Sequence, residues 1–390
     1  LNTESNVQFG EGGAGTFSDG KLNTLIKDKY GRNKEVLRIF VKHGAPREIL
    51  YDYKPHIGTD ILKKIVRSMR EEILASGGDV RFETRVTDLL IADGRIKGLV
   101  LNGQEELLAE HVVLALGHSA RDTFSMLLKQ KIVIEPKPFA IGMRVEHPQE
   151  LINLSQYGKK EAGELGNAIY KLTAETSEKR GVYTFCMCPG GYVVNASSEE
   201  GRLAVNGMSY SGRNGANANS AIIVSVTPAD YGSDEPLAGI GFQRRLEEKA
   251  FSAGCGKIPV ERYGDFSDTA TTGHIPTEFV PAIKGQWTFA DVKSVLPDSL
   301  SEAFIEGMEQ FGHRIPGFDD ANAVVSGIES RTSSPVRIVR DDTLQANIRG
   351  IYPCGEGAGY AGGITSAAMD GVRVAEAIAS CYAPFSEIGK

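Results

Sequence analysis

The segment from Gly350 to Ser380 constrains the fold of this chain more than any other. A short apolar stretch, Ile351 to Cys354, leads into a turn that is unusually rich in glycine, and a run of small residues with helical character follows. Backbone N–H groups at a helix start have no intrahelical partner, and glycine lets a ligand approach the main chain closely. The pattern therefore predicts a strand, an anion-binding turn and a helix.

Gly357, Gly359 and Gly362 also match the dinucleotide fingerprint G-x-G-x-x-G. That fingerprint requires a complete βαβ unit with an acidic residue about 20 positions further on. Only 28 residues follow Gly362, and they have the pattern of one helix and a short tail. We therefore expect this turn to contact something other than a pyrophosphate held in a first βα unit.

The pattern before residue 136 is typical of the second half of a Rossmann-type domain. Helical spacing of apolar residues, with Thr59 or Asp60 as a cap, predicts a helix that ends at Gly77-Gly78. Residues 79–109 predict a three-stranded meander whose first strand includes Val80 to Val86, with hairpin turns at Asp93-Gly94 and Asn102-Gly103. The continuous apolar run Val112 to Leu116 predicts a buried parallel strand that ends at Gly117.

From about residue 137 the sequence becomes rich in strand patterns. Leu246 to Ala253 and Ser299 to Phe311 are expected to be helical. Four apolar runs predict an antiparallel sheet: Phe139–Val145, Val182–Met187, Leu203–Met208 and Ile222–Val226. The fold class is therefore α/β, a Rossmann-like dinucleotide-binding domain with an inserted mixed α+β substrate domain. We predict boundaries of 1–136 for the first part of the dinucleotide domain, 137–330 for the insertion and 331–390 for the C-terminal part.

Composition excludes few classes of protein. No apolar run in the 390 residues approaches the ~18 needed to span a membrane, and the N-terminus is not a signal peptide. Five widely spaced cysteines indicate a reducing cytoplasm. The net charge of −7 argues against non-specific nucleic-acid binding. Residues 21–70 nevertheless carry 13 Lys and Arg against 5 Asp and Glu, which is either a solvated basic face or a patch for phosphates of a nucleotide or a polyanionic partner.

Several stretches together carry a resemblance to a known family. They are Glu4–Lys21, Val112–Ala120, Phe185–Gly191, Asn217–Ser220, Glu329–Arg337 and Gly350–Ser380. The chain resembles the bacterial FAD-dependent, or NAD(FAD)-utilizing, dehydrogenases, which are flavoproteins of the two-dinucleotide-domain type. The resemblance implies an FAD/NAD(P)-binding fold and an oxidoreductase that transfers hydride through N5 of FAD, with NAD(P)H as a candidate electron donor and a small-molecule substrate.

One departure from that family concerns the N-terminal part. Members begin with a strand, a G-x-G-x-x-G turn, a helix and a second strand with an acidic tip, which hold the ADP half of FAD. Here Gly10, Gly12 and Gly15 match the expression, but only Asn6 to Phe9 precede them as a candidate strand. We therefore expect an N-terminally incomplete Rossmann-like domain, with FAD bound weakly or not at all by this chain.

The resemblance also implies which residues contact FAD. Glu356 would accept a hydrogen bond from the ribityl chain, with Gly355 beside it, and Gly362, Gly363 and Ile364 would place a helix start beside the flavin ring. Gly10, Gly12, Gly13, Gly15 and Ser18 would cover the pyrophosphate and isoalloxazine, Val86 would contact adenine and Gly117 would let the dinucleotide pass. The alternatives are a loop carboxylate for Glu356, a tight packing turn for the glycines and a core position for Val86.

Catalytic candidates are few, and no metal site is predicted. Cys186 and Cys188 form a C-x-C motif, which suggests a redox pair, although a buried cysteine is commonly a small hydrophobe. Arg331 is a candidate clamp for a carboxylate substrate, with a surface ion pair as the alternative. Two other functions stay open: a flavin-dependent RNA-modification or partner-binding protein, supported by the basic segment 21–70, and a scaffold that binds no flavin.

Overall fold

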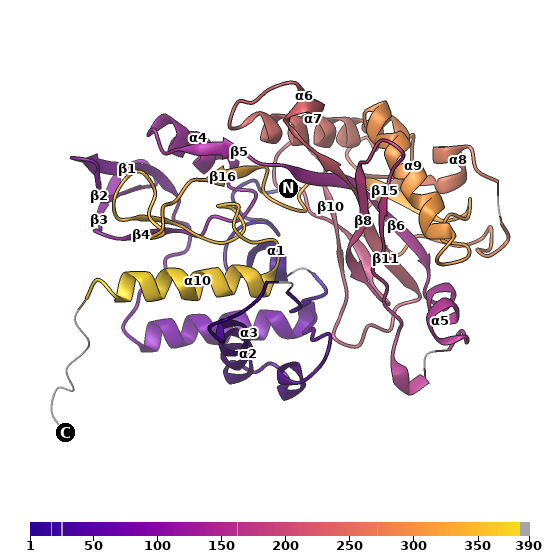
Figure 1. Cartoon of the computed structure of the whole chain (residues 1–390), viewed down its shortest axis with the longest axis horizontal. Coiled ribbons are helices and arrows are strands. Elements are labelled where there is room, and N and C mark those ends of the chain that lie inside the picture. Colours follow the sequence, from indigo (N-terminus) through magenta and orange to yellow (C-terminus); the bar gives the residue numbers. More distant parts are fainter. Residues whose placement is uncertain (17, 25, 162, 271, 383–390) are drawn as a thin grey trace.

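A seven-stranded sheet forms the largest part of the molecule (Figure 1). The computed structural model describes residues 1–16, 18–24, 26–161, 163–270 and 272–382. Central strands β6 and β11 pair antiparallel over ten residues, from Phe139 opposite Val226 to Pro148 opposite Asn217. The strand order is β14 (Trp287–Phe289), β12 (Ile258–Arg262), β15 (Val324–Glu329), β6 (Phe139–Pro148), β11 (Asn217–Val226), β8 (Gly181–Cys188) and β7 (Thr173–Glu175).

Alternation along these strands gives the sheet two different faces. Ile141, Met143 and Val145 of β6 point into a large apolar core, which α7 (Ala238–Ala253) and α9 (Asp298–Gly312) cover. This matches the predicted helices and three of the four predicted strands. The intervening residues of β6 include Arg144 and Glu146, so the opposite face carries buried charges.

The fourth predicted strand belongs to a different sheet. Residues Val205–Met208 form β10, which pairs with β9 (Tyr192–Asn195), and β9 pairs in turn with β13 (Ile283–Lys284). The expectation that 203–208 joins the main sheet is therefore wrong. The small sheet lies against the charged face of the large one, because Gly207 has no side chain to displace the Arg144 guanidinium from its place against it.

Three helices form a layer on the other side of the molecule: α2 (Arg32–Lys42), α3 (Thr59–Ala75) and α10 (Ile364–Ala379) (Figure 1). Leu62 and Ile65 of α3 pack with Met369 of α10 in one apolar cluster. The helix and its end are as predicted, but the proposed cap is wrong. The Thr59 hydroxyl donates to the carbonyl oxygen of Ser18, and the Asp60 carboxylate accepts from Ser211, so Gly58 precedes the helix without a side-chain cap.

The predicted meander is present, with a later start. Strands β1 (Val86–Ala92), β2 (Arg95–Leu101) and β3 (Glu105–Leu108) pair antiparallel, and both residues of each hairpin turn have positive φ, as Asp-Gly and Asn-Gly turns require. Residues 80–85 are not a strand, because Glu83 has a left-handed backbone with φ 52° that breaks the extended pattern.

Two short strands that lie far apart in the sequence form a parallel pair. β17 (Ile351–Pro353) pairs with β4 (Val112–Leu114), with Ile351 opposite Val112 and Pro353 opposite Leu114. The expected neighbourhood of these segments is confirmed. Val113 is 44% exposed, so the expectation of a strand buried on both faces is wrong. Beside them, β5 (Ile134–Pro136) pairs antiparallel with β16 (Val336–Ile338), and α4 (Arg121–Lys129) follows the β4 turn.

Short elements complete the described structure. They are α1 (Gly13–Thr16), α5 (Gln149–Tyr157), α6 (Pro228–Tyr231), α8 (Tyr263–Ser267) and the 3₁₀ turns Arg47–Leu50, Gly163–Leu165 and Lys293–Val295. In the described part of the chain, every helix is too short or too polar to cross a lipid bilayer. The same residues hold no group of three or more His, Cys, Asp or Glu side chains placed for a metal ion.

Candidate functional site

Two glycine turns meet where β4 and β17 end. A Cβ atom on Gly357 would lie 2.6 Å from the carbonyl carbon of Gly117, closer than real Cβ atoms approach a backbone, so only glycine fits at position 357. Gly117 and Gly355 both have positive φ, 66° and 75°. The contact lies at the carboxyl ends of parallel strands, the edge at which open α/β sheets bind their ligands.

Glu356 lies beside this contact and has a fixed partner. Its Oε1 is 3.1 Å from Nδ1 of His118, and its side chain remains 24% exposed. The side-chain amide of Gln243 approaches Nε2 of the same histidine at 3.2 Å and donates to the carbonyl oxygen of Ser330 at 2.7 Å. A neutral His118 with its hydrogen on Nδ1 satisfies both contacts, since Nδ1 then donates to the carboxylate and Nε2 accepts from the amide. The Glu356 carboxylate is thereby oriented and still open to solvent.

The start of α10 forms the next wall of the site. The N–H groups of Gly362 and Gly363 donate to the Ser366 hydroxyl at 3.3 and 3.1 Å. No atom lies within 4 Å of the position that a Cβ on Gly362 would take. Ile364 packs against Gly15, whose Cβ would lie 3.4 Å from Cγ1 of that isoleucine. The loop of residues 8–20 therefore lies against the helix start.

The same loop is tied to the Gly117 turn. The Ser119 hydroxyl donates to Oε1 of Gln8 at 3.2 Å, and the Gln8 amide donates to the carbonyl oxygen of Ala196 at 3.0 Å. Ser18 stabilises the loop itself, since its hydroxyl donates to the carbonyl oxygen of Gly15 at 2.6 Å. Three separate segments, around residues 8, 119 and 196, thus meet next to the two glycine turns.

The glycines of this loop differ in their surroundings. A Cβ on Gly10 would meet no atom within 4 Å, whereas one on Gly12 would collide with Thr16 and approach Val66 to 3.4 Å. A Cβ on Gly13 would lie 3.5 Å from the carbonyl oxygen of Gln8. Packing thus accounts for Gly12 alone, because a Cβ on Gly13 or Gly15 would be at an ordinary contact distance. Gly10, Gly12 and Gly13 also have positive φ, and the space beside Gly10 is open.

Val86 lies at a separate groove of about 280 Å³. Asp122 and Met126 of α4 form its other wall. The predicted adenine contact of Val86 stays a prediction. The residue is half-buried at the start of β1 and packs against the apolar cluster of this part of the molecule.

Arg331 is held in a buried network of charges. Its Nε and Nη2 pair with both oxygens of Glu247 at 3.0 and 2.9 Å, and Arg121 of α4 pairs with the same carboxylate. Burial alone would raise the pKa of Glu247, but Arg331 and Arg121 outweigh it and hold that pKa below its ordinary value. The remaining nitrogen of Arg331 donates to Ser119 and to Ser198, so the guanidinium joins the segment around Ser198 to the Gly117 turn.

Cys186 and Cys188 lie on β8, on the face of the large sheet that carries Arg144. The Cys188 thiol is buried and donates to the carbonyl oxygen of Cys186 at 3.2 Å. Cys186 is partly exposed. Neither cysteine is in a disulfide, and their nearest cation is the fully buried guanidinium of Arg144.

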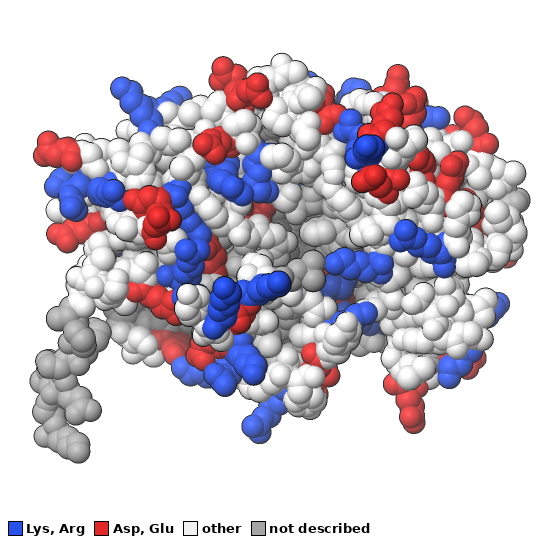
Figure 2. All heavy atoms as spheres, viewed as in Figure 1, with Lys and Arg blue, Asp and Glu red and all other residues white. Residues whose placement is uncertain are grey.

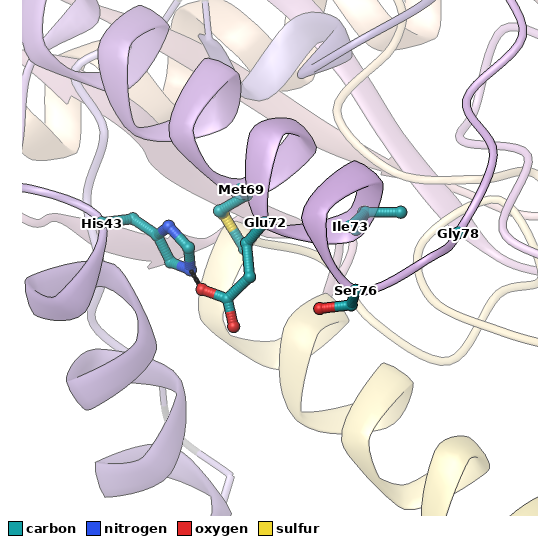
Figure 3. Close-up of a pocket in the computed structure, with 6 residues that line it drawn as sticks. All are labelled: His43, Met69, Glu72, Ile73, Ser76 and Gly78. Atoms are coloured by element: carbon teal, nitrogen blue, oxygen red, sulfur yellow. Dashed lines mark ion pairs between the residues drawn. The ribbon is translucent and has the colours of Figure 1, made fainter.

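A groove of about 400 Å³ lies elsewhere, beside α3 (Figure 3). Figure 3 shows His43 turned toward Glu72, and their side chains form an ion pair of 3.2 Å between Nε2 and Oε2. Both groups already have partners, since Lys42 also pairs with Glu72 and Ser68 contacts Nδ1 of His43. The chemistry of the residues favours the glycine turns over this groove, and we place the site at the turns.

Part of the positive charge of the basic segment 21–70 is paired. Among its described side chains, Arg32 pairs with Glu376, Lys42 with Glu72, Arg67 with Glu71 and Arg70 with Glu11. Figure 2 shows Lys and Arg mixed with Asp and Glu over the surface and a hollow in the middle of the molecule, between the α10 side and the large-sheet side.

The arrangement at the turns fits FAD. The open main chain at Gly10, Gly117 and Gly362 leaves room where side chains would otherwise stand, and the partly exposed carboxylate of Glu356 beside these turns is an acceptor suited to hydroxyl groups. Sequence reasoning missed Gln8, Ser119 and Gln243, which support these groups from distant segments. It also missed Lys137, whose pKa is lowered by burial and then by Arg337, while Glu356 acts in the opposite direction.

Comparison with known proteins supports the same cofactor. Residues 138–332 match the family model described as "FAD-dependent protein, C-terminal domain-like". An uncharacterised protein of Clostridium beijerinckii is 50% identical over 383 residues, which cover 97% of this chain and 71% of that one.

Solved structures with a similar arrangement are more distant. An oxidoreductase from Methanosarcina mazei has 14% identity and a TM-score of 0.35, and the match covers 81% of this chain and 54% of that one. A flavocytochrome c3 fumarate reductase in its open conformation has 11% identity and a TM-score of 0.35, over 89% of this chain and 61% of its own. This chain thus spans a little over half the length of those structures, and TM-scores this low carry no argument about its fold. On the family match and the Clostridium relative, the chain belongs to the family of FAD-dependent proteins that share this C-terminal-type domain.

Proposed function

We propose that this chain binds FAD between the Gly117 turn, Glu356 and the start of α10, and that it acts as a flavoprotein oxidoreductase. One observation carries the proposal. The turns after β4 and β17 touch through their backbones at Gly117 and Gly357, and leave the main chain open at Gly117 and Gly362. Family membership supports the identity of the cofactor.

Different residues of the site bind different parts of FAD. Glu356, oriented by His118, accepts hydrogen bonds from hydroxyls of the ribityl chain. The helix start at Gly362 and Gly363 supplies partial positive charge, because backbone dipoles sum to about half an elementary charge there. That charge favours electron-rich groups at the ring edge. When bound, FAD supplies hydride transfer at its N5.

The buried network behind the site keeps these groups in place. His118 contacts Glu356, and Gln243 contacts His118. The Gln243 amide also donates to the carbonyl oxygen of Ser330, next to Arg331. Each member is hydrogen-bonded, so reorientation of Glu356 would leave a buried donor or acceptor without a partner. The network thus pre-organises the carboxylate before the cofactor arrives.

Binding of FAD to a Gly362→Val variant tests the proposal. Position 362 has an ordinary φ and open space around it, so the variant is expected to fold normally. Gly371, in the middle of α10, also has open space and ordinary φ, so Gly371→Val is the matched control. We expect calorimetry and visible absorbance to show FAD binding to the parent and the control, and binding weaker by at least tenfold in Gly362→Val. Equal affinity in all three, or no binding to the parent at millimolar FAD, would contradict the proposal.

The electron donor is a separate part of the proposal. We propose NADH or NADPH, because the resemblance of the whole chain is to nicotinamide-using flavoproteins. Anaerobic mixing of the FAD-loaded protein with each nucleotide should bleach the absorbance of the oxidised flavin with one of them. If dithionite bleaches it and both nucleotides fail, the nicotinamide part is wrong while the FAD site stands.

A further inference from the structure

A strained bulge in β8 places a cysteine in an unusual backbone conformation. Asn219 of β11 is opposite Cys188 and Ala221 is opposite Phe185, so Cys186 and Met187 together face Ser220 alone. Cys186 has φ 46°, a left-handed conformation that is strained for a residue other than glycine. Strain of this kind persists where the surrounding structure enforces it, and often marks a functional position.

The bulge makes the two thiols of the C-x-C motif unequal. Cys188 is 0% exposed, and its thiol donates to the carbonyl oxygen of Cys186 at 3.2 Å. Cys186 is partly exposed. Cys186 is therefore the more accessible residue of the two, and Cys188, two residues away, is buried. This is the arrangement of an attacking and a resolving cysteine.

Two cations act on this pair, and each is itself paired with a carboxylate, Arg144 with Glu329 and Lys21 with Asp19. The fully buried Arg144 donates from Nη1 to the carbonyl oxygen of Cys186 at 3.0 Å and lies 4.0 Å from Sγ of Cys188. Glu329 balances part of this charge through two hydrogen bonds of 2.6 and 2.9 Å. Lys21 adds a further cation, and its side chain is 29% exposed.

These neighbours favour a thiolate at the reachable position. A hydrogen bond from Cys188, followed by the charges of Lys21 and Arg144, lowers the pKa of Cys186 to about 6, although burial and Glu329 act against them. Burial raises the pKa of Cys188 above its ordinary value. The attacking thiol is thus charged at neutral pH while the resolving thiol keeps its proton.

Lys21 links the pair to the glycine-rich part of the molecule. It acts on Cys186 and belongs to the segment that follows the 8–20 loop. The next residue, Leu22, accepts a hydrogen bond of 2.7 Å from Thr365 in the first turn of α10.

We propose that Cys186 and Cys188 form a redox-active dithiol that reduces low-molecular-weight disulfides. The Cys186 thiolate attacks one sulfur of a disulfide R–S–S–R, forms a mixed disulfide and releases R–S⁻. Cys188 then loses its proton and attacks Sγ of Cys186, which forms the Cys186–Cys188 disulfide and releases the second R–S⁻. Two protein thiols are oxidised, one external disulfide is reduced to two thiols, and the two protons of the cysteines balance the two thiolates.

The test uses the aromatic disulfide 5,5′-dithiobis(2-nitrobenzoate), whose released thiolate absorbs visible light. The background variant is Cys255→Ser with Cys381→Ser, which removes the two exposed cysteines of the described chain. No FAD is needed, so the outcome is independent of the proposed cofactor site. When the background variant is folded, we expect each chain to release two aromatic thiolates and to retain no aromatic thiol as a mixed-disulfide label. Its mass should then be lower by two hydrogens.

Two further substitutions assign the roles. With Cys188→Ser added, we expect one thiolate released and one label retained on Cys186. With Cys186→Ser added, release should slow at least tenfold, because Cys188 and the remaining Cys354 are buried. Near-ultraviolet circular dichroism confirms that each variant is folded. Retention of label by the background variant, or equally fast release from the Cys186→Ser variant, would overturn the proposal.

Lys21 provides an independent readout. Lys21→Gln should raise the pKa of Cys186 and slow the reaction several-fold at pH 6.5 but little at pH 9, where the thiol is ionised in either protein. Lys27→Gln, an exposed lysine nearby in the sequence, is the matched control and should leave both rates unchanged. The same slowing at both pH values would mean that Lys21 acts on structure and not on the thiolate.

Discussion

The backbone of Gly357 lies against the carbonyl group of Gly117, so closely that a single added methyl group has no space. The contact joins the turn that follows β4 to the turn that follows β17. Both the parallel pairing and the proposed cofactor site depend on these turns keeping this distance.

Gly357→Ala should therefore destabilise the fold. The added Cβ has to push two turns apart, and overpacking of this kind typically costs about 1–3 kcal/mol. Gly362→Ala, in the same turn but facing open space, should change stability by less than about 0.5 kcal/mol. Thermal unfolding without FAD compares the two, and equal melting temperatures would show that the turns are not in contact.

Glu247→Gln should be strongly destabilising. The carboxylate is buried and neutralises Arg121 and Arg331, and removal of one partner of a buried ion pair typically costs about 3–5 kcal/mol. Glu376→Gln removes a more exposed pair with Arg32 and should cost less than about 1 kcal/mol. Denaturant unfolding of both variants gives the comparison. A small effect at Glu247 would mean that the two arginines find other partners.

Glu146 should make stability fall as the pH rises toward neutrality. Burial raises the pKa of its carboxyl to about 7, above the ordinary 4.5, although hydrogen bonds from Asn217 and Ala282 act against the shift. The folded state then holds a proton that the unfolded state has lost, so stability decreases between about pH 4.5 and 7 and changes no further above that range. Glu146→Gln should remove this decrease.

His147 contributes to the pH dependence of stability with the opposite sign. For this reason the unfolding free energy of the Glu146→Gln variant is compared with that of the parent at each pH. Burial lowers the pKa of its imidazole to about 4, so its contribution to stability is lost as the pH falls from about 6.5 toward 4. The difference in unfolding free energy between Glu146→Gln and the parent, followed from pH 5 to pH 8, isolates the carboxyl. A constant difference would contradict a protonated Glu146.

Glu356→Gln should weaken FAD binding about 10- to 100-fold, if a charge-assisted hydrogen bond worth about 1.5–3 kcal/mol is lost. Glu135→Gln, an exposed acid on β5, is the control for the change in net charge. Calorimetric titration with FAD measures both. Unchanged affinity in the Glu356 variant would leave that residue as a loop carboxylate held by His118.

Much of the fold is predictable because its signals are local. The turn of residues 355–363 and the hairpins at Asp93-Gly94 and Asn102-Gly103 are specified by residues that tolerate positive φ, and the apolar runs of β6, β8 and β11 are long enough to be unambiguous. Their arrangement is less so. The Leu203–Met208 run has a strand pattern, but which sheet it joins depends on Gly207 meeting the Arg144 guanidinium, a contact between segments 63 residues apart in the sequence.

The site was partly predictable for the same reason. Several glycines and Glu356 lie in one continuous motif. The residues that support them come from distant segments, around residues 8, 118 and 243. Gln243 lies in the middle of an amphipathic helix, and nothing in its neighbourhood distinguishes it from a surface glutamine. Arg331 and Cys186 have recognisable motifs, but their partners Glu247 and Arg144 carry no spacing signal.

The pairing of β4 with β17 has a consequence for how the chain is made. Ile351 leaves the ribosome about 240 residues after Val112, which at about 5–20 residues per second is a delay of roughly ten to fifty seconds. During that time the segments on either side of β4 in the sequence are already present but β17 is not. The edge of β4 is then open to unwanted pairing. The middle block can form its own sheet within this interval, and the last helix then closes the molecule. The order of synthesis thus makes completion of the glycine turns a late event, so the proposed cofactor site can form only after β17 and the turn that follows it have been translated.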